Sequence, residues 1–345
     1  MGDTTLMTSI LQGLLADGWD ITVLGKTQSR RLLEDNYPAV RWIEFDAPWT
    51  AFRGKYRLWC WPWGDLLRVL RRVRHERFDA AASIRRDPRD HLLFWMARVP
   101  RRIGFRAPYS WHFLNEAIPV LLATDHRVED WWSVQQRIST TATTFFPPRL
   151  AANSQKLERF RTLFARDGRP VLALHCGARN AVRRWPEPYL RELVERLHEH
   201  FDFQLALLPD GDGYGHTLRD LAEHTFTGLD LAELKAVLSC ATLLLGNDSG
   251  PAHVTDALGV PVIAIFGPGN SHKMRPFNQR NLVVMRDICP YRPCSDYCRF
   301  PESYCLTQLT SAIVWRDVYA YLTDSALLPA RNRASDRLKP HTTVT

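Results

Sequence analysis

The sequence predicts an α/β protein with two Rossmann-like domains in tandem, and three observations carry this prediction. Short apolar strands alternate with amphipathic helices along most of the chain, which is typical of parallel sheets with helical crossovers. The length of 345 residues accommodates two domains of ordinary size. Hydrophobic residues make up 45% of the chain and charged residues 24%, values that argue against wholesale disorder.

The first domain is predicted over residues 1–150. Apolar residues recur at helical spacing in some segments and form short strand-like runs in others. The predicted elements are, in chain order, a helix over 4–16, a strand at 21–24, a helix through 31–33, a strand at 41–45, a helix over 65–76, a strand at 78–84 and a helix over 90–98. Phe145-Phe-Pro-Pro148 breaks this alternation, and we expect a hinge near 147–168.

The second domain, predicted over 168–330, has the cleaner pattern and follows a polar helix over 154–165. Its predicted elements are a strand at 170–175, a helix over 188–200, a strand at 203–208, a helix over 231–240, a strand at 242–245, a helix over 251–258 and a strand at 260–266. The polar tail at 331–345 is expected to be disordered.

The positive charge of the chain is concentrated in its first half. The formal net charge is +8, and residues 51–112 hold 14 Arg and one Lys against five acidic residues, interleaved with eleven aromatics. Such a segment can meet an anionic membrane surface, a phosphorylated substrate or a nucleic acid, although the arginines could also be solvated helix faces. No nucleic-acid-binding motif accompanies the charge, so we expect no nucleic-acid partner.

The stretch Leu243-Leu-Leu-Gly-Asn-Asp-Ser-Gly-Pro-Ala-His253 carries the strongest chemical signal. An apolar strand ends, small residues turn the chain, and a helix begins. We therefore expect the backbone N–H groups of Asp248, Ser249 and Gly250 to point outward at a helix N-terminus, a site for a diphosphate. His253, on the first turn, can face the same site. The alternative is a structural cap with His253 merely packed.

A second candidate element is His175-Cys-Gly-Ala-Arg-Asn-Ala-Val-Arg-Arg-Trp-Pro186. It leaves a strand through Gly177 and carries Arg179, Arg183 and Arg184 in one loop before a helix. Guanidinium groups can bind phosphate bidentately, and open parallel sheets bind ligands beyond the carboxyl ends of their strands. The alternative is that some of these arginines are solvated surface residues.

These residues resemble glycosyltransferase family 9, the ADP-heptose:lipopolysaccharide heptosyltransferases and their relatives. The resemblance rests on Thr227-Gly-Leu-Asp-Leu-Ala-Glu-Leu234, Asn247-Asp-Ser-Gly-Pro-Ala-His253, Phe266-Gly-Pro268 and Arg183-Arg-Trp-Pro186. It is strongest from about 170 to 310. It implies a GT-B fold, in which two Rossmann-like domains face each other across a cleft, with the donor nucleotide on the C-terminal domain and the acceptor on the N-terminal one.

The resemblance also assigns roles. Arg183 corresponds to the diphosphate-binding Lys that precedes Trp-Pro in the family, whereas the family's ribose-contacting Glu is not evident in Pro209-Asp-Gly-Asp-Gly-Tyr214. The predicted donor-binding residues are Gly177, Arg179, Arg183, Arg184, Asp248, Ser249, Gly250 and His253.

The N-terminus carries the predicted general base. Family members open with a strand, then a Gly-Asp turn whose Asp is the proposed base, then a helix. Met1-Gly2-Asp3 begins at that turn, so we expect a first strand to be missing, through a late start-codon assignment or trimming. Asp3 and Arg183 are the predicted catalytic residues: the first accepts the acceptor's proton and the second stabilises the leaving diphosphate. The alternative for Asp3 is a plain helix N-cap.

Four cysteines, Cys289, Cys294, Cys298 and Cys305, lie close together in the sequence. Their number is compatible with a structural zinc or iron site, although their spacing lacks the paired C-x2-C of common zinc modules. The alternative is a set of structural thiols. The family's transfer chemistry needs no cofactor, so a metal here would serve the fold.

The sequence is therefore interpreted as an inverting glycosyltransferase that moves a heptose from a nucleotide-diphosphate donor, ADP-heptose being favoured, to a lipopolysaccharide-core or other surface-glycan hydroxyl. The alternatives are a GT-B nucleotide-sugar epimerase, a non-catalytic nucleotide-sugar-binding protein and a heptosyltransferase with a protein acceptor. The absence of an apolar membrane-spanning run predicts a cytoplasmic protein, with peripheral contact at the inner face of the inner membrane.

Overall fold

The computed structural model describes residues 1–51, 55–119, 126–139 and 144–331. The chain divides into two compact units. Unit 1 comprises Met1–Ala151 and His272–Phe277, and unit 2 comprises Ala152–Ser271 and the chain from Asn278 onward. Among the described helices, none is long and apolar enough to cross a membrane. The predicted disordered tail lies, beyond Arg331, outside the described residues.

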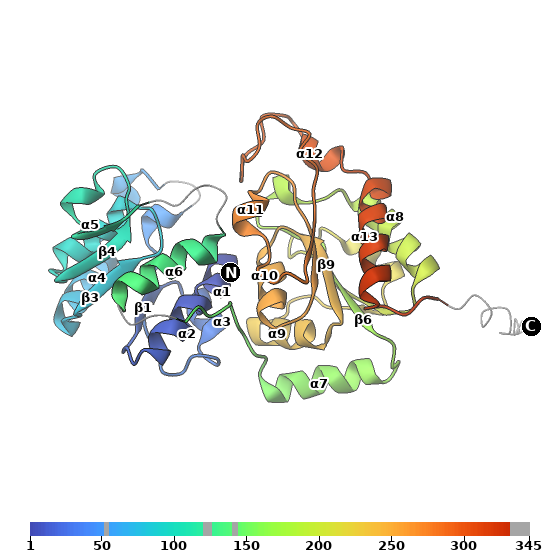
Figure 1. Cartoon of the computed structure of the whole chain (residues 1–345), viewed down its shortest axis with the longest axis horizontal. Coiled ribbons are helices and arrows are strands. Elements are labelled where there is room, and N and C mark those ends of the chain that lie inside the picture. Colours follow the sequence, from blue (N-terminus) through green and yellow to red (C-terminus); the bar gives the residue numbers. More distant parts are fainter. Residues whose placement is uncertain (52–54, 120–125, 140–143, 332–345) are drawn as a thin grey trace, which may run out of the picture. The chain divides into compact units, whose positions relative to one another are not determined.

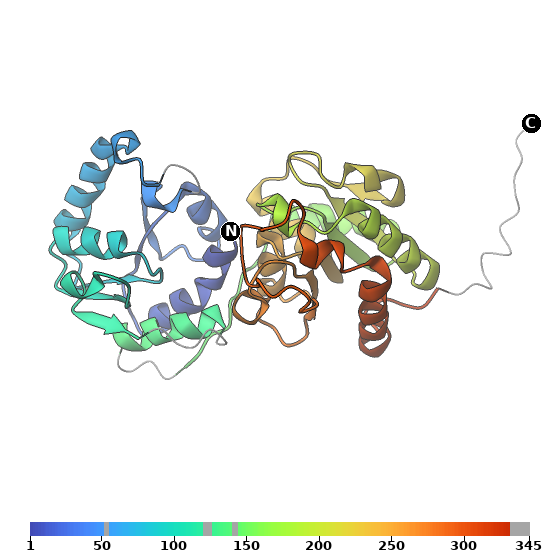
Figure 2. The same ribbon diagram turned by 90° about the horizontal axis from the view of Figure 1, so that it is seen from above.

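Unit 1 alternates helices and short strands. Its elements are α1 (Gly2–Leu6), α2 (Thr8–Ala16), β1 (Thr22–Gly25), α3 (Thr27–Leu33), β2 (Arg41–Glu44), η1 (Pro48–Thr50), η2 (Leu58–Cys60), α4 (Trp63–Glu76), β3 (Ala80–Ser83), α5 (Pro88–Met96), β4 (Arg101–Phe105), η3 (Ser110–His112), β5 (Glu116–Ile118) and α6 (Arg127–Ile138). The single helix predicted over 4–16 is instead two helices that meet at Met7. The helices and strands of unit 1, coloured blue to green, can be followed in Figure 2.

The strands of unit 1 form two separate parallel sheets. One has the order β1-β2 and the other β3-β4-β5. Leu6, Ile10 and Leu14 from the first two helices pack with Ile103 and Trp131 in one of its apolar cores. Among the described residues, no strand pairs these two sheets with each other. Whether a further strand belongs to this unit stays a prediction.

A short segment, His272–Phe277, packs with unit 1 although the flanking chain belongs to unit 2. Lys273 Nζ lies 2.7 Å from Asp130 Oδ2 of α6, and His126 Nε2 lies 2.8 Å from the Arg275 carbonyl oxygen. The Phe277 ring lies 5.5 Å from that of Phe145. The predicted boundaries did not separate this segment, because its partners are distant in the sequence.

Unit 2 contains a longer series of elements: α7 (Ser154–Ala165), β6 (Val171–His175), η4 (Ala181–Arg183), α8 (Glu187–His200), β7 (Gln204–Leu208), η5 (His216–Leu221), β8 (His224–Thr225), α9 (Leu231–Cys240), β9 (Leu243–Asn247), α10 (Gly250–Ala257), β10 (Val262–Ile265), α11 (Ser271–Met274), β11 (Leu282–Val284), α12 (Tyr304–Thr307) and α13 (Ser311–Ser325). Of these, α11 runs from unit 2 into the 272–277 segment.

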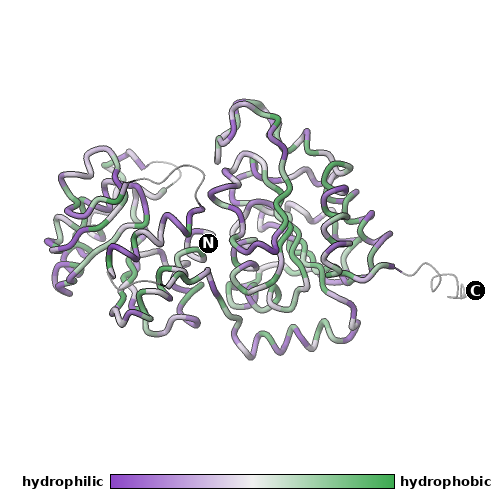
Figure 3. Tube along the Cα trace, viewed as in Figure 1, coloured by the Kyte–Doolittle hydropathy of each residue, from purple (hydrophilic) through white to green (hydrophobic). Residues whose placement is uncertain are grey.

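The six strands of unit 2 form one parallel sheet in the order β11-β10-β9-β6-β7-β8. In Figure 1, α8 and α13 lie on one side of this sheet and α9 and α10 on the other. Strands covered on both faces are apolar along their length, as the hydrophobic colouring of these strands in Figure 3 illustrates. The order reverses between β6 and β9, which is where open α/β sheets bind ligands.

Helix α7 belongs to unit 2 rather than to a free hinge. Lys156 Nζ pairs with Asp230, and Arg159 Nη1 lies 3.4 Å from Glu233 Oε1, so α7 is joined to the start of α9. The Gln204 side chain donates to the Phe164 carbonyl, which ties the end of α7 to β7. The unit boundary therefore lies at residue 151, ahead of α7.

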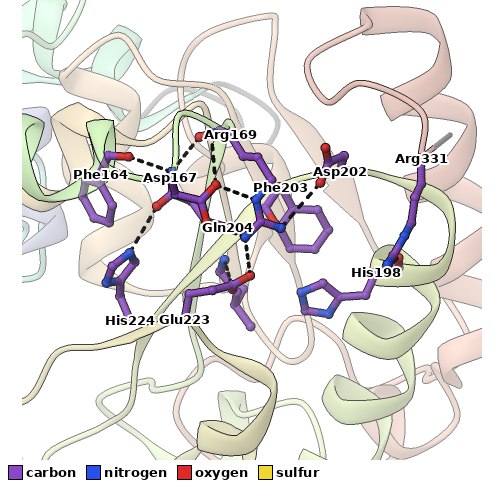
Figure 4. A network of polar contacts seen from close by, with 11 residues as sticks. Phe164, Asp167, Arg169, His198, Asp202, Phe203, Gln204, Glu223, His224 and Arg331 are labelled. Atoms are coloured by element: carbon purple, nitrogen blue, oxygen red, sulfur yellow. Dashed lines mark hydrogen bonds and ion pairs between the residues drawn. The ribbon is translucent and has the colours of Figure 1, made fainter. Parts of the chain in front are cut away.

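Arg169 fastens the amino ends of the strands beneath α7 (Figure 4). It donates bidentately to Asp167 at 2.6 Å, to Glu223 at 2.7 Å and to the Phe203 carbonyl at 2.7 Å. Its hydrogen bonds hold the pKa of Asp167 below its usual range. One guanidinium thus connects the loop after α7 with the starts of β6, β7 and β8.

We predict that Arg169→Ala lowers the free energy of unfolding by about 1–3 kcal/mol, because it leaves two carboxylates and a carbonyl without their charged donor. The lowered pKa of Asp167 stabilises the fold only at pH values above the pKa that this carboxyl has in the unfolded chain. The difference in unfolding free energy between Arg169→Ala and wild type should therefore shrink below about pH 4. Chemical denaturation at several pH values measures this. Arg166→Ala, at an exposed neighbour, is the matched control and should change stability by less than about 0.5 kcal/mol. If Arg169→Ala and Arg166→Ala lowered the free energy of unfolding equally, the role assigned to Arg169 would be contradicted.

Candidate functional site

Two loops of unit 2 lie side by side where the strand order reverses. Strands β6 and β9 are paired with His175 opposite Gly246, so the loops that follow them begin at the same edge of the sheet. A third loop, which follows β10, begins beside the β9 loop because Ile265 is paired with Asn247. The chemical signals of the sequence therefore converge on the reversal point of the sheet.

Buried residues fix the loop between β6 and α8. The Asn247 side chain donates to the Cys176 carbonyl at 2.6 Å and accepts from the Trp185 N–H at 3.0 Å, so it holds both ends of the loop. The Trp185 ring is fully buried and donates to the Leu309 carbonyl. A side chain at Gly177 would lie 2.5 Å from Asp210 Oδ2, which explains the glycine. Trp185 thus anchors the preceding arginines.

The turn between β9 and α10 differs in one respect from the prediction. Helix α10 begins at Gly250 with Ser249 as its N-cap, so the first N–H groups of the helix lie at this turn. The Asp248 N–H, however, donates to the Ile265 carbonyl at 3.0 Å. It is therefore not available to a ligand, because the pairing with β10 extends one residue beyond β9. His253 is buried on the first turn.

His175 lies at the end of β6, next to this turn. Its Nδ1 lies 3.3 Å from the Ser249 hydroxyl. Burial lowers the pKa of His175 to about 4, and the Asp210 carboxylate only partly opposes this. The imidazole is therefore neutral at pH 7 and adds no positive charge to the site.

Arg183 lies across the two loops and binds two carboxylates. Its Nη1 is 3.2 Å from Asp248 Oδ2, and its Nη2 is 2.9 Å from Asp296 Oδ1. The Arg183 Nε lies 3.4 Å from the Ser295 carbonyl oxygen. The structure thus brings together Arg183 and Asp248, which the sequence predicts in one site, and adds Asp296.

Asp248 is a buried carboxylate with an unusual proton affinity. Burial raises its pKa to about 6, the Arg183 charge opposes this shift, and the Asp296 charge adds to it. A side chain at Gly269 would lie 2.3 Å from Asp248 Oδ2, so the loop after β10 lies against this carboxylate, whose side chain is 5% exposed. Close packing, rather than solvent, therefore surrounds this carboxylate.

The other two arginines of the loop differ from each other. Arg184 donates to Asp210 at 2.8 Å, to Asp212 at 2.7 Å and to the Ala178 carbonyl at 3.2 Å. Its guanidinium also lies over the Tyr214 ring. Arg179 is exposed. Arg184 therefore holds the loop after β7 against the site, whereas Arg179 projects into solvent.

Asp3, the predicted general base, belongs to unit 1. It is exposed in the first turn of α1, whose N-cap is Met1. The N-cap alternative for Asp3 is therefore wrong, since the helix begins one residue before it. Its carboxylate remains open to a substrate hydroxyl.

The cysteine loop, residues 289–305, lies beside Arg183. Cys289 and Cys305 are buried, whereas Cys294 and Cys298 are partly exposed. Burial, together with the neighbouring thiols, raises the pKa of Cys294. Within the described residues, no three Cys, His, Asp or Glu side chains are arranged to hold a metal ion. Beyond the effect of burial, Cys289, Cys294 and Cys298 all contribute to the raised pKa of Cys305, so the four thiols are neighbours, although within the described residues they do not form a metal site.

Three residues of this site escaped the sequence analysis as individual candidates: Asp296, Asp210 and His175. The first lies in the cysteine loop, where the thiols masked it as a signal. The second lies in the Pro209–Tyr214 stretch, which lacks the glutamate that the family resemblance leads one to expect there. The sequence offered one signal for such site residues, namely a hydrophilic residue at the carboxyl end of a parallel strand.

We predict that Asp248→Asn stabilises the protein more at pH 8 than at pH 5. Because the folded pKa of about 6 exceeds the unfolded value of about 3.9, wild type loses stability as the pH rises through this range, and Asn does not titrate. The difference in the free energy of unfolding between Asp248→Asn and wild type should change by about 1 kcal/mol between pH 5 and pH 8. Asp220→Asn, at an exposed ion pair, should show no such change. A pH-independent difference for Asp248→Asn would show that its carboxylate is not buried as described.

The chain is similar in sequence to known glycosyltransferases. A sequence model of glycosyltransferase family 9 (heptosyltransferase) matches residues 66–302. Lipopolysaccharide heptosyltransferase 1 of Pseudomonas aeruginosa is 28% identical over 202 residues, which cover 56% of this chain and 54% of that protein.

Two solved structures show the same fold. The Escherichia coli ADP-heptose lps heptosyltransferase II has a TM-score of 0.70 at 20% identity and covers 94% of this chain and 96% of its own. The E. coli heptosyltransferase WaaC with ADP-2-deoxy-2-fluoro heptose has a TM-score of 0.65 at 18% identity, with 92% and 96% covered. The predicted α/β fold of GT-B type is confirmed. Since the family match spans more than half of the sequence, the chain belongs to glycosyltransferase family 9, the heptosyltransferase family.

Proposed function

We propose that the protein transfers a heptose from ADP-heptose to a hydroxyl of the lipopolysaccharide core or another surface glycan. The single observation that carries this proposal is the position of Arg183 beside the N-terminus of α10, at the reversal point of a parallel sheet. That arrangement suits a diphosphate, and the related heptosyltransferases supply the choice of sugar.

Two groups of unit 2 can bind the diphosphate. The Arg183 guanidinium can donate two parallel hydrogen bonds to it, and the N–H groups of Ser249 and Gly250 lie at the positive end of α10. The choice of ADP as the nucleotide rests on the WaaC structure, which holds an ADP-sugar analogue. Asp210 and Asp212, on the loop after β7, are the carboxylates nearest in sequence to the expected ribose contact.

Asp3 is the proposed general base. Its carboxylate accepts the proton of the acceptor hydroxyl, whose oxygen forms a bond to the anomeric carbon while the bond from that carbon to the diphosphate breaks. Attack opposite the leaving group inverts the anomeric configuration. Arg183 stabilises the negative charge that accumulates on the departing diphosphate. These roles need no cofactor.

Unit 1 has the surface chemistry of an acceptor or membrane contact. Its aromatic side chains include Trp59 at 80% exposure and Trp111 at 64%. Helix α4 adds exposed arginines, among them Arg68 and Arg72. Aromatic rings and arginines suit the interface of an anionic membrane. We infer that the protein works in the cytoplasm, in peripheral contact with the inner membrane, on a lipid-linked acceptor; a protein acceptor is the alternative.

We predict that Asp3→Ala lowers heptosyl transfer at least about 100-fold while the thermal shift induced by ADP is unchanged, because a general base acts on the transfer step and not on donor binding. Asp17→Ala, at another exposed unit 1 carboxylate, is the control and should keep full activity. Full activity of Asp3→Ala would refute the catalytic assignment. Conversion of the nucleotide sugar to an epimer without acceptor would instead favour the epimerase alternative.

The structural zinc or iron ion stays a prediction. Binding it would require the four thiols of the cysteine loop to adopt a tetrahedral arrangement that they do not show here. Elemental analysis of the purified protein tests this prediction, which expects about one zinc or iron ion per chain, lost in a Cys294→Ser/Cys298→Ser variant. A protein free of both metals would identify the cysteines as structural thiols.

A further inference from the structure

Arg183 has three oxygen partners, and two of them come from the cysteine loop. The guanidinium binds Asp248 through Nη1, Asp296 through Nη2 and the Ser295 carbonyl through Nε. The Asp248 side chain is 5% exposed, that of Arg183 26% and that of Asp296 42%. Asp248, the buried partner, therefore holds one edge of the Arg183 guanidinium. Asp296, the exposed partner, covers the edge that an incoming ligand would meet.

The backbone around Asp296 is held independently of its carboxylate. The Asn180 side chain donates to the Asp296 carbonyl at 2.8 Å, and the Ser295 N–H donates to the Pro268 carbonyl at 2.9 Å. Farther along, the Ser303 hydroxyl donates to the Val182 carbonyl at 2.6 Å. The carboxylate can therefore turn away from Arg183 by side-chain rotation while the loop stays in place.

Negative charge is in excess around the proposed diphosphate site. Arg183 faces Asp248 and Asp296, and Arg184 faces Asp210 and Asp212. A diphosphate that approaches Arg183 would meet two carboxylates bound to the same guanidinium. Of these two, Asp296 is the one exposed enough to be replaced, because its side chain is 42% exposed and that of Asp248 is 5% exposed.

We propose that Asp296 occupies the phosphate-binding edge of Arg183 in the free protein and is displaced by the donor diphosphate. Asp296 then sets the affinity for the nucleotide sugar. This inference rests on the proposed function, since it takes Arg183 to be the diphosphate ligand. A partly exposed carboxylate pair is weak, whereas a diphosphate offers more negative charge to the same donors. Replacement of the Asp296 carboxylate by the diphosphate is thus favourable overall. Breaking the pair between Asp296 and Arg183 still costs free energy, and this cost weakens donor binding.

The test is a calorimetric titration of ADP into the full chain and into Asp296→Asn at low salt. The variant should bind ADP about fivefold more tightly, because the exposed carboxylate at position 296 no longer competes for Arg183. Asp220→Asn is the matched control: it makes the same change of charge at an exposed carboxylate paired with Arg191, and should bind within twofold of wild type. Asp296→Ala serves as a second variant, and thermal unfolding verifies that each variant is folded.

A double substitution distinguishes competition from a structural effect. In an Arg183→Met background, Asp296→Asn should change ADP affinity by less than twofold, because the shared partner is gone. Equal affinity of wild type and Asp296→Asn would overturn the inference and leave the proposed function intact. Weaker binding by Asp296→Asn would overturn it too, since the carboxylate would then hold Arg183 in place for the ligand. Failure of wild type to bind ADP would refute the proposed function and this inference together.

Discussion

The ion pair between Arg183 and the buried carboxylate of Asp248 is the contact on which the candidate site depends. It joins the loop after β6 to the turn after β9, and both loops begin where the strand order of the sheet reverses. A carboxylate with so little access to water keeps its charge only because a guanidinium lies against it. The pair thereby fixes one edge of Arg183 and leaves the other edge to Asp296 or to a ligand.

The fold supports this contact from both ends of its strands. At the carboxyl ends, Asn247 and Trp185 hold the arginine loop through buried hydrogen bonds. At the amino ends, Arg169 joins the loop after α7 to the starts of β6, β7 and β8. The site therefore lies on elements joined by buried hydrogen bonds, whereas the side chains of Asp296 and Arg179 are more exposed. Donors held in this way suit a site that binds a charged diphosphate.

Much of the fold and part of the site could be predicted from local patterns. The bounds of α7 and α9 agree with the predicted helices because each has a polar cap, Asn153 or Asp230, ahead of an amphipathic run. Parallel pairing of apolar strands likewise places the two predicted loops at one edge. Local patterns cannot show contacts between distant segments, so they missed the pairing of Asp296 with Arg183 and the packing of the 272–277 segment with unit 1. They also assigned the Asp248 N–H to a ligand, because the extra hydrogen bond to Ile265 depends on sheet register.

The central claim is that the donor diphosphate binds at Arg183 and the N-terminus of α10. A crystal structure of the protein with ADP tests it most directly. The account predicts phosphate oxygens within hydrogen-bonding distance of the Arg183 guanidinium and of the Gly250 N–H, with the Asp296 carboxylate turned away. A nucleotide bound elsewhere, with the contacts of Arg183 to Asp248 and Asp296 unchanged, would contradict it.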